Sequence, residues 1–243
     1  LPVKKEGTWE SIREEGTKLH QKNSNYYLLN QEVTSTSEKI IMPYHAQLTG
    51  RQLVNEDFTL GFDKASITQT FAYLKSLYDN GVLQPLGESS LFNDKTEQNP
   101  KWINGEAAMT IAYSSDITKH VGTASNFEIT TTRFPILENA KDTGIVVRPP
   151  QFISINKNTK HLEEAAKFVN WFFNDEASIL ANGVERSVPA QASSQKLLVE
   201  HGKMDPVVAE AVETAVNKAS TTPNYINNNR ELMQILNEVL GKL

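Results

Sequence analysis

The sequence predicts an α/β fold that is rich in helices and has a short mixed sheet. Apolar residues recur with helical spacing over residues 63–81 and again over residues 162–173, which indicates two amphipathic helices. Short apolar runs at residues 26–29 and 107–112 are instead typical of strands. Helical segments outnumber strands along the chain, so we expect mixed α and β structure in which helices dominate.

The remaining elements follow from the same periodicities and from local capping residues. In chain order, the expected helices cover residues 8–22, 63–80, 115–120, 162–173, 174–181, 193–201, 206–219 and 231–240. The expected strands cover residues 26–29, 107–112, 127–132 and 152–155. Thr8 can cap the first helix, Asn80-Gly81 can close the second, and Pro206 suits a helix start. Residues 31–57 have no clear pattern, and residues 87–99 are typical of a polar loop.

Composition limits the class of protein. The 243 residues can bury a core in one large domain or two small ones. The net charge of −5 argues against a nucleic-acid partner, which would require a basic face. The sequence has no cysteine, which excludes disulfides and thiol chemistry. No apolar stretch is long enough to span a membrane, and there is no signal peptide, so we expect a processed or truncated chain.

The most informative stretch is a helix–turn–strand pattern over residues 102–112, which turns at Asn104-Gly105. The strand is followed by one aromatic and three hydrogen-bonding side chains: Tyr113, Ser114, Ser115 and Asp116. Ligands in α/β folds bind at the carboxyl ends of strands, and this mixture of groups suits a sugar. The alternative is that Ser114 or Ser115 caps the next helix and that Tyr113 belongs to the core.

Residues 102–109 resemble the aromatic-x-Asn-Gly-x-Ala-Ala-Met signature of the family 1 extracellular solute-binding proteins, the sugar-binding subunits of ABC importers. Further blocks resemble that family in the same order along nearly the whole chain: Thr8-Trp9-Glu10, Phe62-Asp63 to Gly81-Val82-Leu83, Pro149-Pro150 with Phe152–Ile155, Glu163–Phe172 and Gly183–Pro189. The resemblance therefore rests on the ordered set of blocks rather than on any one of them.

The resemblance implies a periplasmic-binding-protein-like fold of type II, of which this chain carries mainly the second, carboxyl-terminal lobe. Residues 1–148 plus 187–243 would form that lobe, and residues 149–186 would complete the first lobe of a full-length protein. Most of the first lobe is absent, which implies a fragment with an incomplete cleft. We expect residues 149–186 to repack against the second lobe, to pair with another copy of the chain, or to be mobile.

The same resemblance implies that the protein captures a carbohydrate in a cleft between lobes without changing it chemically. It also implies a membrane permease of the ABC importer as partner, no cofactor, and an extracellular, lipid-anchored or periplasmic location. Two other functions stay open: a carbohydrate-active enzyme such as a glycoside hydrolase, and an excised lobe without ligand-binding activity. A hydrolase would need two suitably spaced carboxylates, and near the expected site only Asp116 qualifies.

Further candidate ligand contacts are Tyr44 and Gln47, in a segment where the family's second lobe often contacts ligand. Glu32 follows the first strand, and Arg186 lies where the chain returns to the second lobe. The alternatives are a loop with Tyr44 packed inward and an ion pair for Arg186.

Most other notable residues have structural interpretations. We expect burial for the three tryptophans and for three residues of the signature, namely Trp9, Trp102, Trp171, Ala107, Ala108 and Met109. The five histidines are scattered without metal-binding spacing, so we expect structural or surface roles and no metal.

Overall fold

The computed structural model describes residues 7–124, 127–147, 152–185, 187–218, 226–227 and 229–242, so Pro149-Pro150 and Arg186 lie outside the described residues. The helices are α1 Trp9–Lys22, α2 Val33–Thr36, α3 Met42–Thr49, α4 Lys64–Asp79, α5 Leu86–Ser89, α6 Pro100–Ile103, α7 Ile117–Thr123, α8 Leu162–Asn174, α9 Glu176–Asn182, α10 Ala192–Glu200, α11 Pro206–Lys218 and α12 Arg230–Leu240. The strands are β1 Tyr27–Leu29 and β2 Ala107–Met109. A π turn, η1, covers Ser37–Ile41, and 3-10 turns cover Ser90–Phe92 (η2), Thr96–Gln98 (η3) and Ser114–Asp116 (η4).

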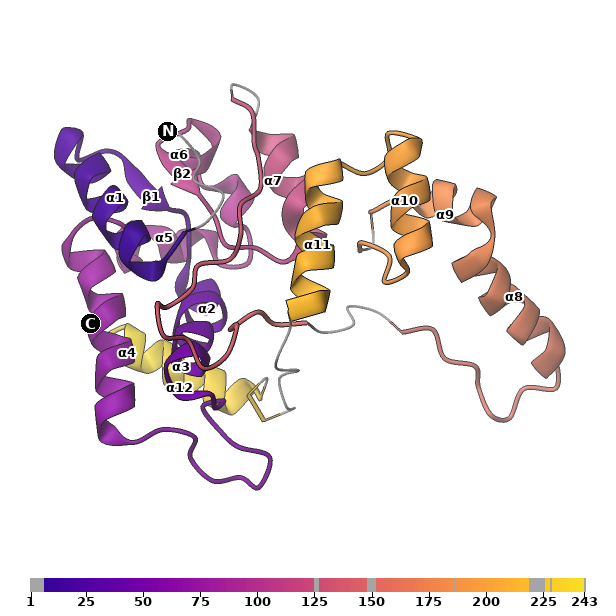
Figure 1. Cartoon of the computed structure of the whole chain (residues 1–243), viewed down its shortest axis with the longest axis horizontal. Coiled ribbons are helices and arrows are strands. Elements are labelled where there is room, and N and C mark those ends of the chain that lie inside the picture. Colours follow the sequence, from indigo (N-terminus) through magenta and orange to yellow (C-terminus); the bar gives the residue numbers. More distant parts are fainter. Residues whose placement is uncertain are drawn as a thin grey trace.

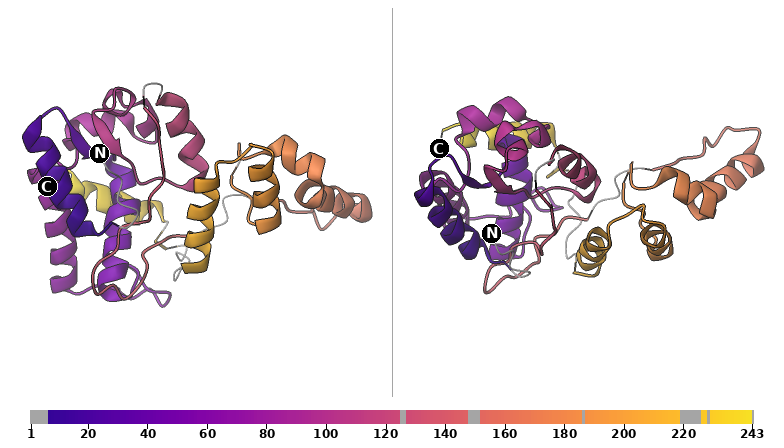
Figure 2. Two further views of the ribbon diagram at one scale, coloured as in Figure 1. Left: turned by 45° about the horizontal axis from the view of Figure 1, so that its top comes forward. Right: turned by 90° about the horizontal axis from the view of Figure 1, so that it is seen from above.

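These elements form a body and an arm (Figure 1). The body holds both strands, α1 to α7 and α12. The arm comprises residues 152–182, with α8 and α9, and α8 lies at its far end in the views of Figure 1 and Figure 2. Helices α10 and α11 lie between the body and α8. None of the helices in the described ranges is long and apolar enough to span a bilayer.

The sheet of the body is parallel rather than mixed. Tyr27 of β1 pairs with Ala107 of β2, and Leu29 pairs with Met109. Leu83 adds a further parallel bridge to Leu29. Because parallel strands point the same way, the segments that follow β1 and β2 leave the sheet at the same edge.

The core of the body is built around Trp9, which is 1% exposed. Its ring makes edge-to-face contacts with Tyr44, Tyr73 and Phe134 at centroid distances of 5.8, 5.8 and 5.7 Å. Tyr44 and Tyr73 stack at 4.4 Å, and the Tyr73 hydroxyl donates to the Trp9 carbonyl oxygen at 2.7 Å. Such aromatic pairs stabilise a fold by more than the area that they bury, so they hold α1, α3 and α4 together at this point.

Two helix boundaries follow the sequence prediction. Thr8 and Asp63 form capping boxes at the starts of α1 and α4. Gly81 follows α4 with a φ of 65°, and a Cβ atom there would lie 2.1 Å from the His20 ring. The close approach of α1 to the end of α4 therefore requires glycine at this position.

The segment without a clear pattern, residues 31–57, contains a continuous helix instead of a loop. Glu32 caps its start, and the helix runs through α2, the π turn η1 and α3 to Thr49. Gly50 ends it with a φ of 73°. The π turn inserts one wide turn between two α-helical stretches, a feature often found at functional sites.

The arm contradicts two sequence predictions. Residues 152–156 form no strand, and Phe152 is 79% exposed. A strand needs a neighbouring edge for its hydrogen bonds, and none of the described residues supplies one here. Trp171 is 46% exposed rather than core, and α8 contains no buried residue.

Beyond α8, the arm packs against α10, which lies between the body and α8. Ile179 and Leu180 of α9 join a small cluster around Leu198 and Val208, which Ile117 of α7 also contacts. Within residues 152–182, α9 thus packs on the rest of the chain, whereas α8 buries no side chain.

Two further predictions are wrong in detail. Residues 127–132 form no strand, although their composition favours one, because strand propensity takes effect only where a partner strand is present. Ala108 is exposed, whereas its neighbour Ala107 is 2% exposed. Successive residues of a strand point to opposite faces, so only one of the two alanines can face the core.

Hydrogen exchange should separate the arm from the body. We expect the amides of α8 to exchange about tenfold or more faster than those of α4, because α8 buries no side chain and α4 buries four. Exchange followed by mass spectrometry measures this directly. Equal protection of the two helices would contradict the arrangement of the arm.

Candidate functional site

The candidate site lies at the edge where both strands end. Three hydrogen bonds join the two exits: Gln31 Nε2 donates to Thr110 Oγ1 at 3.2 Å and to the Ile111 carbonyl at 3.0 Å, and Thr110 Oγ1 donates to the Asn30 carbonyl at 3.0 Å. Gln31 is 2% exposed, and the three bonds are partly buried. They fix the path of the chain that leads from β2 to Tyr113.

Tyr113 is partly exposed and lies against the π turn. Its hydroxyl donates to Glu38 Oε2 at 3.1 Å, and the Lys39 ammonium lies 5.3 Å from the centre of its ring. The sequence pattern did not single out Glu38 or Lys39. In the sequence, these two residues directly precede the apolar Ile40-Ile41, and this pattern does not indicate a π turn.

The other three residues of the predicted group follow in the 3-10 turn η4. Ser114 is exposed, Ser115 is partly exposed, and Asp116 forms an ion pair with Lys119 at 3.0 Å. Neither serine caps α7, which has no side-chain cap. The structure therefore brings Tyr113, Ser114, Ser115 and Asp116 together on the surface beside the π turn.

His120 connects this group to the signature stretch. Its Nδ1 lies 2.9 Å from the Asp116 carbonyl oxygen, which can only accept, so Nδ1 carries the proton. Nε2 then accepts from Thr96 Oγ1 at 3.1 Å. The Trp102 ring packs edge-on against the imidazole at 5.3 Å, and its Nε1 donates to the His120 carbonyl at 3.3 Å. Burial lowers the pKa of His120 below its usual value.

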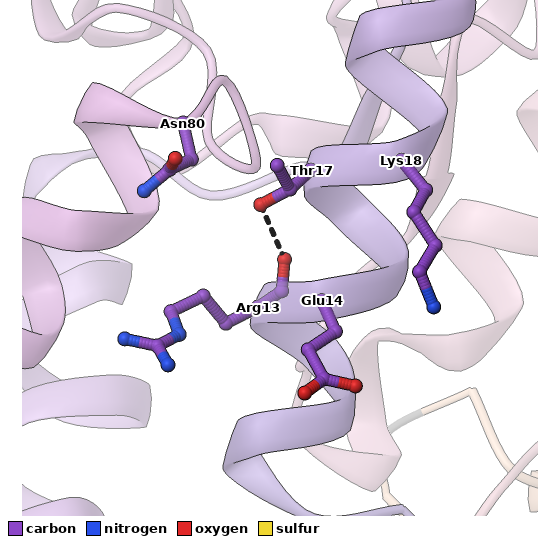
Figure 3. Close-up of a pocket in the computed structure, with 5 residues that line it drawn as sticks. All are labelled: Arg13, Glu14, Thr17, Lys18 and Asn80. Carbon is purple, nitrogen blue, oxygen red and sulfur yellow. Dashed lines mark hydrogen bonds between the residues drawn. The ribbon is translucent and has the colours of Figure 1, made fainter.

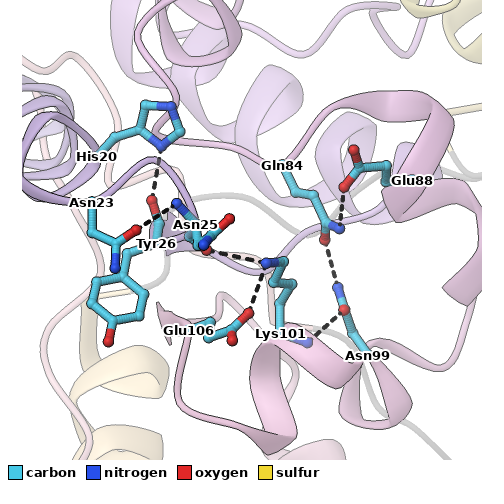
Figure 4. A network of polar contacts seen from close by, with 9 residues as sticks. All are labelled: His20, Asn23, Asn25, Tyr26, Gln84, Glu88, Asn99, Lys101 and Glu106. Atoms are coloured by element: carbon cyan, nitrogen blue, oxygen red, sulfur yellow. Dashed lines mark hydrogen bonds and ion pairs between the residues drawn. The ribbon is translucent and has the colours of Figure 1, made fainter.

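A second polar network holds the start of the signature in place (Figure 4). Lys101 Nζ pairs with Glu106 Oε2 at 2.7 Å and donates to the Asn25 carbonyl at 3.3 Å, just before the two strands begin. Asn99 Nδ2 donates to Gln84 Oε1 at 2.8 Å, and both of these side chains are buried. This network anchors α6 and does not expose groups for a ligand.

Glu32 has an internal role. It is 1% exposed, and its carboxylate accepts from the backbone amides of Thr34 and Ser35, each at 2.7 Å. A carboxylate at a helix start satisfies the amides that lack partners there. Glu32 therefore stabilises α2 and does not face a ligand.

Tyr44 and Gln47 also point into the core. Tyr44 is 6% exposed within the aromatic cluster around Trp9, and Gln47 is 0% exposed. The Gln47 side chain makes four hydrogen bonds, accepting from Trp9 Nε1 at 2.9 Å and the Leu137 amide at 2.8 Å. Its amide donates to the Pro135 and Thr143 carbonyls, each at 2.8 Å. Burial and full bonding remove both residues from the candidate contact surface.

Two other features carry no site. Figure 3 shows a shallow depression beside α1 that is lined by Arg13, Glu14, Thr17, Lys18 and Asn80. It offers no aromatic ring, and Thr17 Oγ1 bonds to the Arg13 carbonyl at 2.7 Å within α1. Among the described residues, no group of three or more His, Asp or Glu side chains is placed to hold a metal ion.

Residues 3–179 match the family model described as bacterial extracellular solute-binding protein. The chain belongs to this family. The match covers most of the chain and confirms the resemblance that the signature indicated. Proteins of this family normally bind solutes rather than transform them, and they act in the extracellular or periplasmic space.

Solved structures confirm a type II periplasmic-binding-protein-like fold for this solute-binding protein. A periplasmic solute binding protein from Pectobacterium atrosepticum is 26% identical, with a TM-score of 0.85 over 98% of this chain. A periplasmic oligogalacturonide binding protein from Yersinia enterocolitica, in complex with saturated digalacturonic acid, is 23% identical, with a TM-score of 0.83 over 99% of this chain. A designed esterase is 23% identical, with a TM-score of 0.84 over 100% of this chain.

These comparisons also show a difference in length. The chain spans 61% of each of the three matched chains. The two matches at 23% identity support the fold alone. The esterase activity belongs to a designed protein and says nothing of native catalysis in this family.

Replacing Gln47 by Leu should lower the free energy of unfolding by about 3 kcal/mol, because four buried or partly buried groups would lose their hydrogen-bond partner. Gln98→Leu makes the same change at an exposed position and should have little effect. Urea denaturation of both variants measures the difference. Equal stability of the two variants would show that Gln47 does not hold the core together.

Stability should fall as the pH drops below about 6.5, because burial lowers the pKa values of His120 and His45 in the folded state. The unfolded chain then binds protons that the folded chain does not. Each histidine contributes at most about 1.4 kcal/mol per pH unit, down to its folded pKa. In His120→Gln, the loss of stability between about pH 7.5 and about pH 5.5 should be smaller than in the native protein. The exposed His161→Gln should leave that loss unchanged.

Proposed function

We propose that this solute-binding protein is the carbohydrate-binding subunit of an ABC importer, and that its second lobe contacts the sugar through Tyr113, Ser114, Ser115 and Asp116. The observation that carries the proposal is the grouping of these side chains at the common exit of two parallel strands. This edge is the usual place for ligands in α/β folds. Family membership supports binding without chemical change.

The chemistry of the group suits a sugar. A tyrosine ring can pack on the apolar face of a sugar ring, while hydroxyls and a carboxylate bond its hydroxyl groups. Asp116 is partly exposed, and its 3.0 Å ion pair with the solvent-exposed Lys119 is a surface pair that contributes little free energy, so a ligand hydroxyl can compete for its oxygens.

The arm supports the proposal that the cleft is incomplete. We place the second lobe in residues 1–148 plus 187–243, and assign residues 149–186 to the completion of the first lobe. The exposed apolar side chains of α8, Leu162, Phe168, Trp171 and Phe173, are those expected to pack in that lobe. Binding between two lobes buries both faces of a ligand, so one lobe alone should bind weakly.

The same arm allows self-association, with α8 of one copy covering α8 of another. An importer permease as partner, and a lipid anchor or a periplasmic location, belong to the proposal through the family. The sugar in the related Yersinia enterocolitica structure, saturated digalacturonic acid, is a reasonable first probe, and maltotriose is a neutral comparison.

The proposal is tested by an NMR titration of the chain with these two sugars. We expect millimolar binding of at least one sugar, with the largest shift changes at the amides of Tyr113, Ser114 and Ser115. Tyr113→Ala should abolish these changes. Tyr26→Ala is the matched control, because Tyr26 is 39% exposed and precedes β1 at the opposite edge of the sheet.

Each outcome of the titration has a clear meaning. Shift changes centred away from Tyr113 would contradict the site. No change with a wider panel of sugars would favour an excised lobe without binding activity. Release of shorter sugars during the titration would favour a hydrolase.

A further inference from the structure

We infer that the π turn Ser37–Ile41 is a positioning device for Tyr113, in which Glu38 fixes the hydroxyl group and Lys39 fixes the ring. The inference rests on the proposed function, because it assigns the π turn a role in presenting Tyr113 to a sugar. It adds two residues that the sequence pattern did not single out. Neither residue is required to touch the sugar.

The π turn is anchored in the body on one side. Ile40 and Ile41 are 1% and 0% exposed in the main core, and Ser37 Oγ donates to Asn237 Oδ1 of α12 at 3.0 Å. These contacts hold one side of the turn against the body. Glu38 and Lys39 are half-buried and face Tyr113 on the other side.

The geometry of the turn sets where its side chains point. The start of the helix is fixed by the Glu32 cap, and α3 is fixed in the core by Tyr44 and Gln47. A π turn contains one residue more than an α turn, so it changes the direction in which its side chains point relative to both ends. This local change is what directs two consecutive residues, Glu38 and Lys39, at the same tyrosine.

A chain of polar contacts begins in the buried part of the lobe. The Glu32 carboxylate accepts from Ser35 Oγ, and Ser35 Oγ lies 3.3 Å from Lys39 Nζ, which donates to it. The Lys39 ammonium in turn lies over the Tyr113 ring, a favourable cation–π arrangement. Glu32 therefore helps to hold Lys39, through Ser35, in its position over the Tyr113 ring and has no direct role in binding a ligand.

The consequence concerns binding. The bond from the Tyr113 hydroxyl to the Glu38 carboxylate is charge-assisted and holds the ring in one rotamer before a sugar arrives. A preordered ring loses less conformational entropy on binding, which increases affinity without a new contact to the sugar. Glu38 and Lys39 are thus positioning residues for Tyr113.

One experiment needs no sugar. In protein with 13C-labelled tyrosine rings, the NMR signal of Tyr113 reports its surroundings and its rate of ring reorientation. Glu38→Gln keeps an oxygen that accepts from the hydroxyl, whereas Glu38→Leu removes the acceptor. We expect a signal close to that of the native protein in Glu38→Gln, and a shifted signal with faster reorientation in Glu38→Leu. Glu163→Leu on the exposed face of α8 is the control and should change nothing.

A Tyr113 signal that is unchanged in Glu38→Leu would overturn the inference. If Glu38→Leu does not fold, Lys39→Met provides the second test, because it removes the cation and keeps an unbranched side chain. An unchanged ring signal in Lys39→Met would then overturn the inference as well.

A second experiment uses whichever of saturated digalacturonic acid and maltotriose binds the native protein. Glu38→Leu and Tyr113→Phe should each weaken binding about three- to tenfold, and Glu38→Gln about twofold or less. The double variant Glu38→Leu/Tyr113→Phe should bind no more weakly than either single variant, because both changes remove the same hydrogen bond. Additive losses would overturn the inference.

The two experiments separate the inference from the proposed function. If neither sugar binds, the proposed function fails, and the ring signal still decides whether Glu38 and Lys39 position Tyr113. If a sugar binds at Tyr113 and the ring signal does not respond to Glu38→Leu, the proposed function stands and the inference fails.

Discussion

The parallel pairing of β1 with β2 is the constraint on which the rest of the body depends. Two short strands in register, Tyr27 with Ala107 and Leu29 with Met109, send both following segments to one edge of the sheet. The segment after β1 becomes the helix with the π turn, and the segment after β2 leads to Tyr113. An antiparallel arrangement would place these exits at opposite edges and separate Tyr113 from Glu38.

The same constraint explains how the body holds the segment around Tyr113 in place. The residues beside Tyr113 are held from within the body, by Gln31 and Thr110 at the strand exits and by the His120 imidazole below η4. These hydrogen bonds join residues of the body to one another. The arm, by contrast, exposes Phe152 and Trp171, and the chain spans 61% of the matched protein from Pectobacterium atrosepticum.

Elements that depend on interactions between residues close in sequence could be predicted from the sequence. Thr8 and Asp63 act on amides three residues away, so both helix starts could be predicted, as could the helix–turn–strand of the signature. The rest depends on partners distant in sequence. Gln47 is a polar residue that becomes core only because Trp9, the stretch Pro135–Leu137 and Thr143 meet at its side-chain amide. Phe152 to Ile155 lack the strand that they would pair with. The π turn lies between two helix ends that are fixed by contacts elsewhere in the body, and no local sequence pattern predicts such a turn.

The most direct test of this account is the set of nuclear Overhauser contacts around Tyr113 in the free protein. The parallel exits and the π turn require contacts from the Tyr113 ring protons to the side chains of Glu38 and Lys39, together with contacts between β1 and β2 in the parallel register. We expect both sets in one spectrum. A Tyr113 ring that contacts neither residue while the strand contacts persist would contradict the account.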